Sequence, residues 1–381
     1  MGDDRGRRDA TVIGTALAIM AAHSHACQLP EPSRGRAEPP VVTPCKIGAV
    51  RALLLRAPGP ITASPLEASD LPTPEPGPGQ IRIKVGACGL CHTDLHEVEG
   101  ELALPKLPVI LGHQVVGVVE ALGPGARRFR EGERVGLPWL HETCGRCESC
   151  RRGDENLCDH ARFTGYDVDG GYAEFTLAPE RFAYRLPEGL SDAEVAPLLC
   201  AGIIGYRALR LSEVRPGDRL GLFGFGASAH LALQVARYWQ CEVYVFTRSP
   251  AHRDLARRLG AAWAGGAEDE PAARLDRAIS FAPAGSLIPL ALAKLRKGGT
   301  LALAGIHLDR IPEMPYSLLY GERALRSVTA STRRDAEELL ALAPRIPLRS
   351  EVELFPMEEA NRALQRLKAS QISGAGVLEI G

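Results

Sequence analysis

The spacing of apolar and polar residues divides the chain into two regions of different expected structure. Before about residue 197, short runs rich in β-branched residues are separated by glycine and proline, and the run 80–85 alternates polar and apolar residues. This pattern is typical of short strands in a small β-barrel-like domain. Beyond residue 197, a strand at 219–223 is followed by a helix at 227–238 and a strand at 242–246. Strands that alternate with helices predict a parallel, doubly wound sheet.

Length and charge narrow the class of protein. The 381 residues suffice for two or three domains with sizeable cores. With 45 basic and 46 acidic residues, the formal net charge is −1, which gives no electrostatic reason to expect nucleic acid or a membrane as partner. We find no internal repeat and no apolar run of membrane-spanning length. A small molecule is therefore the expected partner.

The first 46 residues differ in composition from the rest of the chain. An arginine-rich start, an apolar run at 11–22 and a small-x-small triplet at 24–26 have the outline of an export signal, which would release a mature chain near Cys27. The alternative is a disordered extension or an upstream start codon, which the proline-rich, charged stretch 30–44 supports. We favour this alternative and a cytoplasmic location, because ten cysteines in a long chain, several of them at two-residue gaps, fit metal ligation better than disulfides and suit a reducing compartment.

Two residues in the first region have the chemistry of half a catalytic metal site. The thiolate of Cys91 and the imidazole of His113 suit zinc, and a catalytic zinc uses three protein ligands and leaves one position open. Cys200 is the best candidate for the third ligand, because it lies where an apolar stretch ends just before a helical run. For each residue, a buried cysteine without metal or a hydrogen-bonded core histidine is the alternative.

The strongest single motif is a group of four cysteines. Cys144, Cys147, Cys150 and Cys158 are close enough to complete a tetrahedral shell around one zinc, and a filled shell indicates a structural site. A disulfide or a redox Cys-x-x-Cys pair is the competing interpretation. A zinc-ribbon module for nucleic acid is disfavoured, because the acidic and basic residues of this loop offset one another.

A glycine-rich turn indicates a dinucleotide site. Residues 224–229 read Gly-Phe-Gly-Ala-Ser-Ala, follow an apolar strand and open a helix, so a pyrophosphate is expected at the helix N-terminus. The cofactor-binding residues expected in this turn are Gly224, Gly226, Ala227, Ser228 and Ala229.

The end of the following strand bears on the choice of cofactor. An NAD site places an acidic residue there to bind the ribose 2′-hydroxyl, whereas this chain has Thr247 and Arg248. A hydroxyl and a guanidinium suit a 2′-phosphate, so the sequence favours NADP(H), with NAD(H) as the alternative. That preference loses its basis if Arg248 points into water.

Together these motifs resemble those of the zinc-dependent alcohol dehydrogenases of the medium-chain dehydrogenase/reductase family, from about residue 47 to the end. The resemblance implies an α/β fold with a GroES-like, β-rich catalytic domain at 47–200 and 334–381, and a Rossmann domain with a doubly wound parallel sheet at 201–333. Residues 1–46 would be an extension. It also implies two zincs per chain, one catalytic on Cys91, His113 and Cys200, and one structural on the four-cysteine motif.

The resemblance assigns roles to the residues around Cys91. Thr93 matches the hydroxyl that hands the alcohol proton onward, and His96 matches the histidine at the solvent end of that relay. Asp94 matches the carboxylate that orients the zinc-bound histidine, and His92 a basic position facing the cofactor pyrophosphate. Family members commonly read Gly-His-Glu at the second ligand, where this chain has Gln114. We therefore expect retained activity with a more electrophilic metal.

The implied function is the interconversion of primary alcohols and aldehydes by hydride transfer with a nicotinamide cofactor, in a homodimer or homotetramer. An NADP(H) preference favours aldehyde reduction. One alternative is a zinc-independent quinone or enone reductase of the same superfamily, which the presence of all seven cysteine and histidine ligands disfavours. The other is a non-enzymatic zinc and dinucleotide-binding protein, which the presence of Thr93 and His96 disfavours.

Two further positions bear on substrate size. Trp139 falls where relatives that prefer ethanol-sized substrates carry a bulky aromatic residue, and Val98 falls where they often carry a second tryptophan. The expected pocket is narrow near the metal and wider further out, so that linear primary alcohols fit and secondary alcohols meet Trp139. The alternative is that Trp139 packs in the core and never touches substrate.

Overall fold

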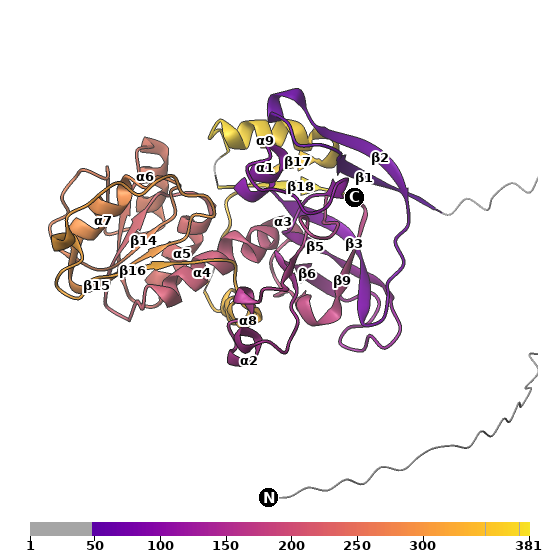
Figure 1. Ribbon diagram of the computed structural model, residues 1–381, viewed down its shortest axis with the longest axis horizontal. Coiled ribbons are helices and arrows are strands. Elements are labelled where there is room, and N and C mark those ends of the chain that lie inside the picture. Colours follow the sequence, from indigo (N-terminus) through magenta and orange to yellow (C-terminus); the bar gives the residue numbers. More distant parts are fainter. Residues whose placement is uncertain (1–47, 347, 373) are drawn as a thin grey trace, which may run out of the picture. The chain divides into compact units, whose positions relative to one another are not determined.

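The computed structural model describes residues 48–346, 348–372 and 374–381 (Figure 1). The predicted extension or export signal at residues 1–46 lies outside the described residues. Within the described ranges, no helix is both long enough and apolar enough to cross a membrane.

The first region folds into three sheets built mainly from antiparallel pairs, the smallest of which joins residues 140–142 to 162–163. A three-stranded sheet has the order β2-β1-β4, and a larger one has the order β10-β6-β5-β3-β18-β17, with β9 also paired to β3. Ile81, Ile83 and Val85 of β3 are buried, whereas the residues between them are more exposed, as the period of two predicts. The strands are β1 (Ala49–Leu55), β2 (Leu66–Pro72), β3 (Gln80–Gly89), β4 (Val109–Ile110), β5 (Val115–Leu122), β6 (Arg134–Leu137), β9 (Phe175–Pro179) and β10 (Tyr184–Arg185).

The end of the chain returns to this larger sheet. Strand β17 (Val352–Pro356) runs parallel to β18 (Ala375–Glu379), and β18 pairs antiparallel with β3. The strands predicted beyond about residue 346 are therefore present, and they belong to the same sheet as β3, which ends just before Cys91.

The second region contains a six-stranded sheet of order β13-β12-β11-β14-β15-β16, in which every neighbouring pair is parallel. Its strands are β11 (Arg219–Phe223), β12 (Glu242–Phe246), β13 (Trp263–Gly265), β14 (Leu275–Ser280), β15 (Leu295–Leu303) and β16 (Ala324–Ser327). The strand order reverses between β11 and β14, and sheets of this kind bind ligands at that point.

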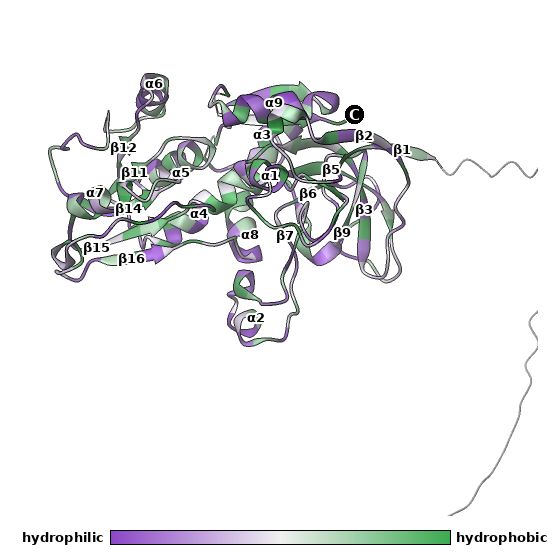
Figure 2. Cartoon of the chain, turned by 45° about the horizontal axis from the view of Figure 1, so that its top comes forward, coloured by the Kyte–Doolittle hydropathy of each residue, from purple (hydrophilic) through white to green (hydrophobic). Residues whose placement is uncertain are grey.

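Helices cover both faces of the parallel sheet. One face packs apolar side chains of α5 (Ala227–Tyr238) and α6 (Pro250–Arg258) in the cluster that contains Leu222 and Val245, and the other packs α7 (Leu287–Lys294) in the cluster that contains Phe223 and Phe246. Because both faces are covered, residues 2 to 5 of both β11 and β12 are buried, whereas the edge strand β16 is mostly exposed and partly purple in the hydropathy view (Figure 2). The prediction of a doubly wound sheet is confirmed.

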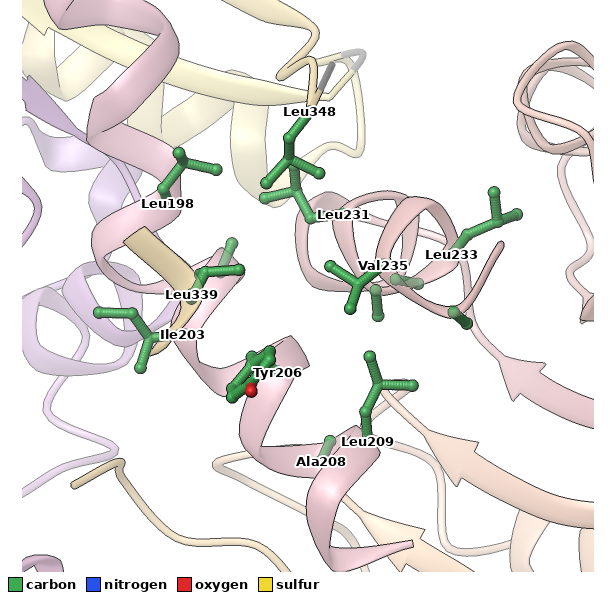
Figure 3. Close-up of a cluster of buried hydrophobic side chains, with 14 of the residues drawn as sticks. Leu198, Ile203, Tyr206, Ala208, Leu209, Leu231, Leu233, Val235, Leu339 and Leu348 are labelled. Carbon is green, nitrogen blue, oxygen red and sulfur yellow. The ribbon is translucent and has the colours of Figure 1, made fainter. Parts of the chain in front are cut away.

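Helix α4 (Ala201–Leu211) leads from Cys200 into the parallel sheet. Its residues Ile203, Tyr206 and Leu209 join Leu231 of α5 and Leu339 of α8 (Arg333–Leu342) in one buried cluster (Figure 3). The other elements are α1 (His92–Val98), β7 (Leu140–Glu142), α2 (Glu148–Arg152), β8 (Arg162–Phe163), α3 (Asp192–Val195), α9 (Ala360–Lys368) and the 3-10 turns at Ile61–Ala63, Glu155–Leu157, Glu180–Phe182, Ala196–Leu199, Tyr316–Leu318 and Met357–Glu359.

Candidate functional site

Cys91 lies where β3 has ended and α1 begins. Its backbone N–H donates a hydrogen bond of 2.7 Å to Asp94 Oδ2, and the backbone N–H of Thr93 lies 3.5 Å from Cys91 Sγ. These contacts satisfy N–H groups that have no partner within the helix. The local sequence Cys-His-Thr-Asp therefore fixes the helix start and, with it, the direction of the thiol.

Three predicted ligands that are distant in sequence lie together. The donor atoms of Cys91, His113 and Cys200 are all within 4.8 Å of one another, and the two sulfur atoms are 3.8 Å apart. Two sulfurs bound to one tetrahedral zinc at about 2.3 Å would be about 3.8 Å apart. Two sulfurs and one imidazole at this spacing fit a zinc with one position left for substrate.

His113 is oriented from behind by Asp94. Both side chains are buried, and His113 Nδ1 lies 3.3 Å from Asp94 Oδ1. This contact leaves the other ring nitrogen as the ligand atom, the arrangement that fixes ring orientation at many metal sites. Burial lowers the pKa of His113, but the charges and hydrogen bonds of Asp94 and Cys91 together outweigh burial and leave the pKa well above its usual range.

The hydrogen bond between the Cys91 and Cys200 thiols shifts their two pKa values in opposite directions. A hydrogen bond from the Cys200 thiol lowers the pKa of Cys91 well below its ordinary value, and the same bond raises the pKa of Cys200. A cation bound between them would favour deprotonation of both, because metal ligands bind as thiolates.

The predicted proton-relay residues occupy different surroundings. Thr93 is buried, and its Oγ1 lies 3.5 Å from Cys91 Sγ. His96 is half-buried, its Nδ1 contacts the carboxylate of Glu101, and its ring centroid is 5.4 Å from that of His307. Sequence reasoning missed Glu101 and His307. An acidic residue five positions after a predicted proton carrier was the only local signal for Glu101, and none pointed to His307.

Trp139 lies against His113, one of the three predicted ligands. Its ring centroid is 4.9 Å from that of His113, with the rings edge to face, and it stacks on Phe163 at 4.9 Å. Tyr166 completes this aromatic group at 5.7 Å. Trp139 is half-buried. It therefore has the position of a side chain that narrows the space beside His113.

The placement of Val98 differs from the prediction. Its side chain is fully buried in the apolar cluster of the β-rich region, together with Leu95 and Leu111. At the last position of α1 it faces the core, where it packs instead of widening the outer part of a pocket. A spacing from Cys91 alone could not distinguish these two faces of the helix.

The four-cysteine motif also forms a compact cluster. The sulfur atoms of Cys144, Cys147, Cys150 and Cys158 lie within 4.8 Å of one another, and those of Cys144 and Cys150 are 3.9 Å apart. All eight cysteines in the described residues are free thiols, so the pattern fits a tetrahedral metal shell better than a disulfide.

Backbone N–H groups surround these sulfurs. The N–H of Cys147 lies 3.3 Å from Cys144 Sγ, and the N–H of Cys150 lies 3.5 Å from Cys147 Sγ. Hydrogen bonds from the backbone of Arg146 and Cys147 lower the pKa of Cys144 to about 6. Donors aimed at sulfur stabilise the thiolate, the form that binds zinc.

The glycine-rich turn has the geometry expected of a dinucleotide site. Gly224 has a φ of 87°, and a Cβ added there would lie 2.9 Å from the backbone nitrogen of Ala282, so the turn requires glycine. Gly226 caps the N-terminus of α5, which begins with Ala227 and Ser228. The third position of the motif, Ala229, is buried. This end of α5 offers unpaired N–H groups of the kind that bind a pyrophosphate.

Arg253 of α6, which the sequence did not single out, contacts a residue at the end of β12. Thr247 is nearly buried, Arg248 is exposed, and Arg253 Nε donates a hydrogen bond of 2.9 Å to the Thr247 carbonyl. The Arg253 guanidinium thus contacts the end of β12 from α6, and Arg248 follows Thr247 in the chain. His92, the other predicted cofactor residue, is exposed at the start of α1.

Comparison with known proteins agrees with the fold and the two clusters. The family described as "Alcohol dehydrogenase GroES-like domain" matches residues 77–188, and the one described as "Zinc-binding dehydrogenase" matches residues 229–345. These two regions together define a medium-chain dehydrogenase/reductase of the zinc-binding type.

Individual relatives of the chain are also alcohol dehydrogenases. The chain is 49% identical over 346 residues to a probable alcohol dehydrogenase AdhA from Mycobacterium tuberculosis, covering 89% of this chain and 100% of that protein. It is 36% identical over 324 residues to an alcohol dehydrogenase from Geobacillus stearothermophilus, covering 83% and 96%. A cinnamyl alcohol dehydrogenase from Sorghum bicolor has a similar structure, with a TM-score of 0.80, 29% identity and coverage of 87% and 97%. The chain belongs to the zinc-dependent alcohol dehydrogenases of the medium-chain dehydrogenase/reductase family, and it is an alcohol oxidoreductase with a nicotinamide cofactor.

Proposed function

We propose that this oxidoreductase depends on zinc, acts on primary alcohols and the corresponding aldehydes, and prefers NADP(H). The observation that carries the proposal is the grouping of Cys91, His113 and Cys200, with the 3.8 Å sulfur separation expected for one tetrahedral ion. A second zinc would be structural and held by the four-cysteine cluster. Each chain would therefore hold two zincs.

The side chains around Cys91 divide the work of proton transfer. When bound, zinc supplies Lewis-acid polarisation of the substrate oxygen and the nicotinamide exchanges hydride. Thr93, buried beside Cys91 Sγ, receives the proton of the alcohol at its hydroxyl. His96 holds the proton at its imidazole and, through its contact with the half-exposed Glu101, releases it toward water.

Trp139 supports the preference for primary alcohols. Its indole lies edge to face with His113 and is held in place by stacking on Phe163. A second carbon substituent at the reacting carbon would need the space that this ring fills. A linear alcohol or a flat unsaturated aldehyde would not.

The preference for NADP(H) is supported by Arg248, just after β12, and by Arg253 of α6. A 2′-phosphate would be attracted by both guanidinium groups, and the hydrogen bond from Arg253 to the Thr247 carbonyl restrains one of them. Aldehyde reduction is then the favoured direction in a cell that keeps this cofactor reduced.

Further proposals concern organisation. We propose a catalytic domain at 47–200 and 334–381 and a Rossmann domain at 201–333, supported by the pairing of β18 with β3.

We also propose assembly as a homodimer or homotetramer. This assembly is supported by the edge position of β16 and by two exposed tyrosines just before it, Tyr316 and Tyr320. Light scattering on the purified protein tests the assembly.

A cytoplasmic location is supported by the free thiols of both clusters, which suit a reducing compartment. The alternative is export, if the N-terminal segment is a functional signal. N-terminal sequencing of native protein separates the two, since export predicts a mature chain that begins near Cys27.

An absorbance assay of the nicotinamide cofactor tests the enzymatic proposal. Ethanol, 1-butanol, benzyl alcohol and the matching aldehydes are each supplied with NADP(H) and with NAD(H). We expect turnover of primary alcohols and aldehydes, greater efficiency with NADP(H), and loss of activity after zinc chelation. Turnover of quinones or enones in place of alcohols, or activity that survives complete zinc removal, would contradict the proposal.

A further inference from the structure

Glu97 is a carboxylate in an unusual environment. Its side chain is fully buried, and neither carboxylate oxygen has a hydrogen-bond partner among the described residues. A buried carboxylate that lacks donors is costly unless another charge compensates it. Glu97 belongs to none of the motifs that the sequence analysis identified, and it has no part in the proton transfer described above.

Glu97 lies on the same helix face as Asp94, which contacts two of the three predicted metal ligands. It lies three residues after Asp94 in α1, so the two carboxylates share one face of the helix, and both are fully buried. Asp94 on that face contacts both His113 Nδ1 and the backbone N–H of Cys91. The inner face of α1 therefore carries two buried carboxyl groups, one of which contacts the residues that would hold a cation.

Charges at the ligand set act on Glu97. Burial raises the pKa of Glu97 well above its usual range, and Asp94 raises it further, whereas positively charged His113 lowers it. A dipositive ion bound next to His113 would act on Glu97 in the same sense as that positive charge, and more strongly. A cation bound by the three ligands would thus also offset the cost of burying the Glu97 carboxylate.

Gln114 is a buried neutral amide directly after His113. It follows the ligand His113, at the position where family members commonly carry glutamate, and it is almost fully buried. Its amide packs against the backbone of Gly89, where an added Cβ would be 2.8 Å from Gln114 Cδ. Glutamate has the same shape as glutamine, so packing leaves room for a carboxylate at this position, and charge is the property that the chain has changed.

We propose that Glu97 is a positioning residue of the catalytic metal centre, an outer carboxylate that supplies from α1 the negative charge that Gln114 lacks. The inference rests on the proposed zinc site. It changes one expectation from the sequence, because the charge lost at position 114 is returned from position 97, and the metal is then no more electrophilic than with a glutamate after His113.

Three variants of the purified holoenzyme test this exchange: Glu97→Gln, Gln114→Glu and the double variant. The measurement is retention of zinc in competition with a chelator, together with the absorption spectrum of cobalt-substituted protein. Loss of an outer partner of a metal ligand typically weakens metal affinity about 10-fold to 100-fold, which is the effect expected for Glu97→Gln. The double variant should recover zinc retention, because it restores the carboxylate from the other side.

Glu99→Gln is the matched control. Glu99 ends the same helix, but its carboxylate pairs with Lys368 at 2.6 Å and does not face the ligands, so zinc retention should be unchanged. Equal zinc retention by Glu97→Gln and Glu99→Gln would overturn the inference, and so would a double variant that stays as weak as Glu97→Gln. If Glu97→Gln does not fold, the double variant decides. Folding with full zinc retention supports the exchange, and failure to fold overturns it.

The same measurements separate this inference from the proposed function. Wild-type protein that takes up no zinc or cobalt at Cys91, His113 and Cys200 would remove the proposed function and this inference together. Normal uptake with no effect of Glu97→Gln would remove only the inference.

Discussion

At the scale of single residues, Trp139 is the side chain that most directly limits the shape of the substrate. Because its indole lies 4.9 Å from the His113 ring, centroid to centroid, it fills space beside the proposed metal. We expect Trp139→Ala to raise kcat/KM for 2-butanol about 10-fold relative to 1-butanol, since one carbon group in an apolar pocket is worth about 1 to 3 kcal/mol. Competition between the two alcohols in a cofactor absorbance assay measures this ratio. A wild-type enzyme that already prefers 2-butanol would contradict the picture.

Arg248 determines the second prediction at this scale. Its exposed guanidinium follows Thr247, at the end of β12. Arg248→Ala should reduce the preference for NADPH over NADH by about 10-fold, because a hydrogen bond to a charged group contributes about 1.5 to 3 kcal/mol. The exposed Arg258, at the opposite end of α6, serves as the control and should leave the ratio unchanged when replaced by alanine. An unaltered ratio in Arg248→Ala would show that this side chain does not meet the ribose.

At the scale of elements, local sequence patterns predict where helices and strands begin and end. They do not predict which side chains the fold brings together. The strands predicted at 219–223 and 242–246 and the helix at 227–238 have the observed bounds, because apolar periodicity and a glycine turn are local signals. Val98 was misplaced because a count of residues from Cys91 does not say which side of a helix faces the core. Glu97 could not be recognised at all, since its importance depends on neighbours that only the fold brings together.

The loop that carries the four cysteines should act as a stability element. Cys150→Ser removes one sulfur from the cluster, and loss of a structural metal belongs to the substitutions that cost about 4 kcal/mol or more. Thermal unfolding and metal analysis should show a lower Tm and loss of one zinc. Ser149→Ala in the same short helix is the control and should leave both quantities near wild type. Unchanged zinc content in Cys150→Ser would argue against a tetrahedral four-thiolate site.

Strand β7 contains a group that makes stability depend on pH. Burial lowers the pKa of His141 from 6.5 to about 4. The unfolded chain therefore takes up a proton as the pH falls through 6.5, whereas the folded chain does so only near 4. The contribution of neutral His141 to the free energy of unfolding is therefore fully present above pH 6.5. It decreases by about 3 kcal/mol as the pH falls to 4.

His141→Asn removes this titration and keeps a polar side chain near Thr164, whose Oγ1 is 3.4 Å from His141 Nδ1. The difference in unfolding free energy between wild type and variant should therefore shrink by about 3 kcal/mol from pH 7 to pH 4. Urea unfolding at a series of pH values measures the difference, in which the titration of the metal ligands cancels. A difference that stays constant with pH would contradict the assignment to His141.

At the scale of the whole molecule, the candidate catalytic centre depends on segments that lie far apart in the chain. Cys91 and Cys200 are 109 positions apart and yet 3.8 Å apart between sulfur atoms. From the residues alone, Cys200 is the best candidate for the third ligand, and only the resemblance to a known family makes that choice definite. The order of strands in each sheet was equally beyond local patterns, because pairing between distant segments leaves no periodic signal along the sequence.

The central claim is that one zinc on Cys91, His113 and Cys200 carries out the interconversion of alcohol and aldehyde. The most direct test measures zinc content and NADPH-dependent reduction of benzaldehyde on the same preparations of wild type and Cys91→Ser. Wild type should hold two zincs per chain and turn over. Cys91→Ser should keep its fold and the structural zinc, lose the other zinc, and lose more activity than the roughly 100-fold that removal of an outer partner of a ligand can cost. A Cys91→Ser protein that holds two zincs and reduces the aldehyde at the wild-type rate would contradict the claim.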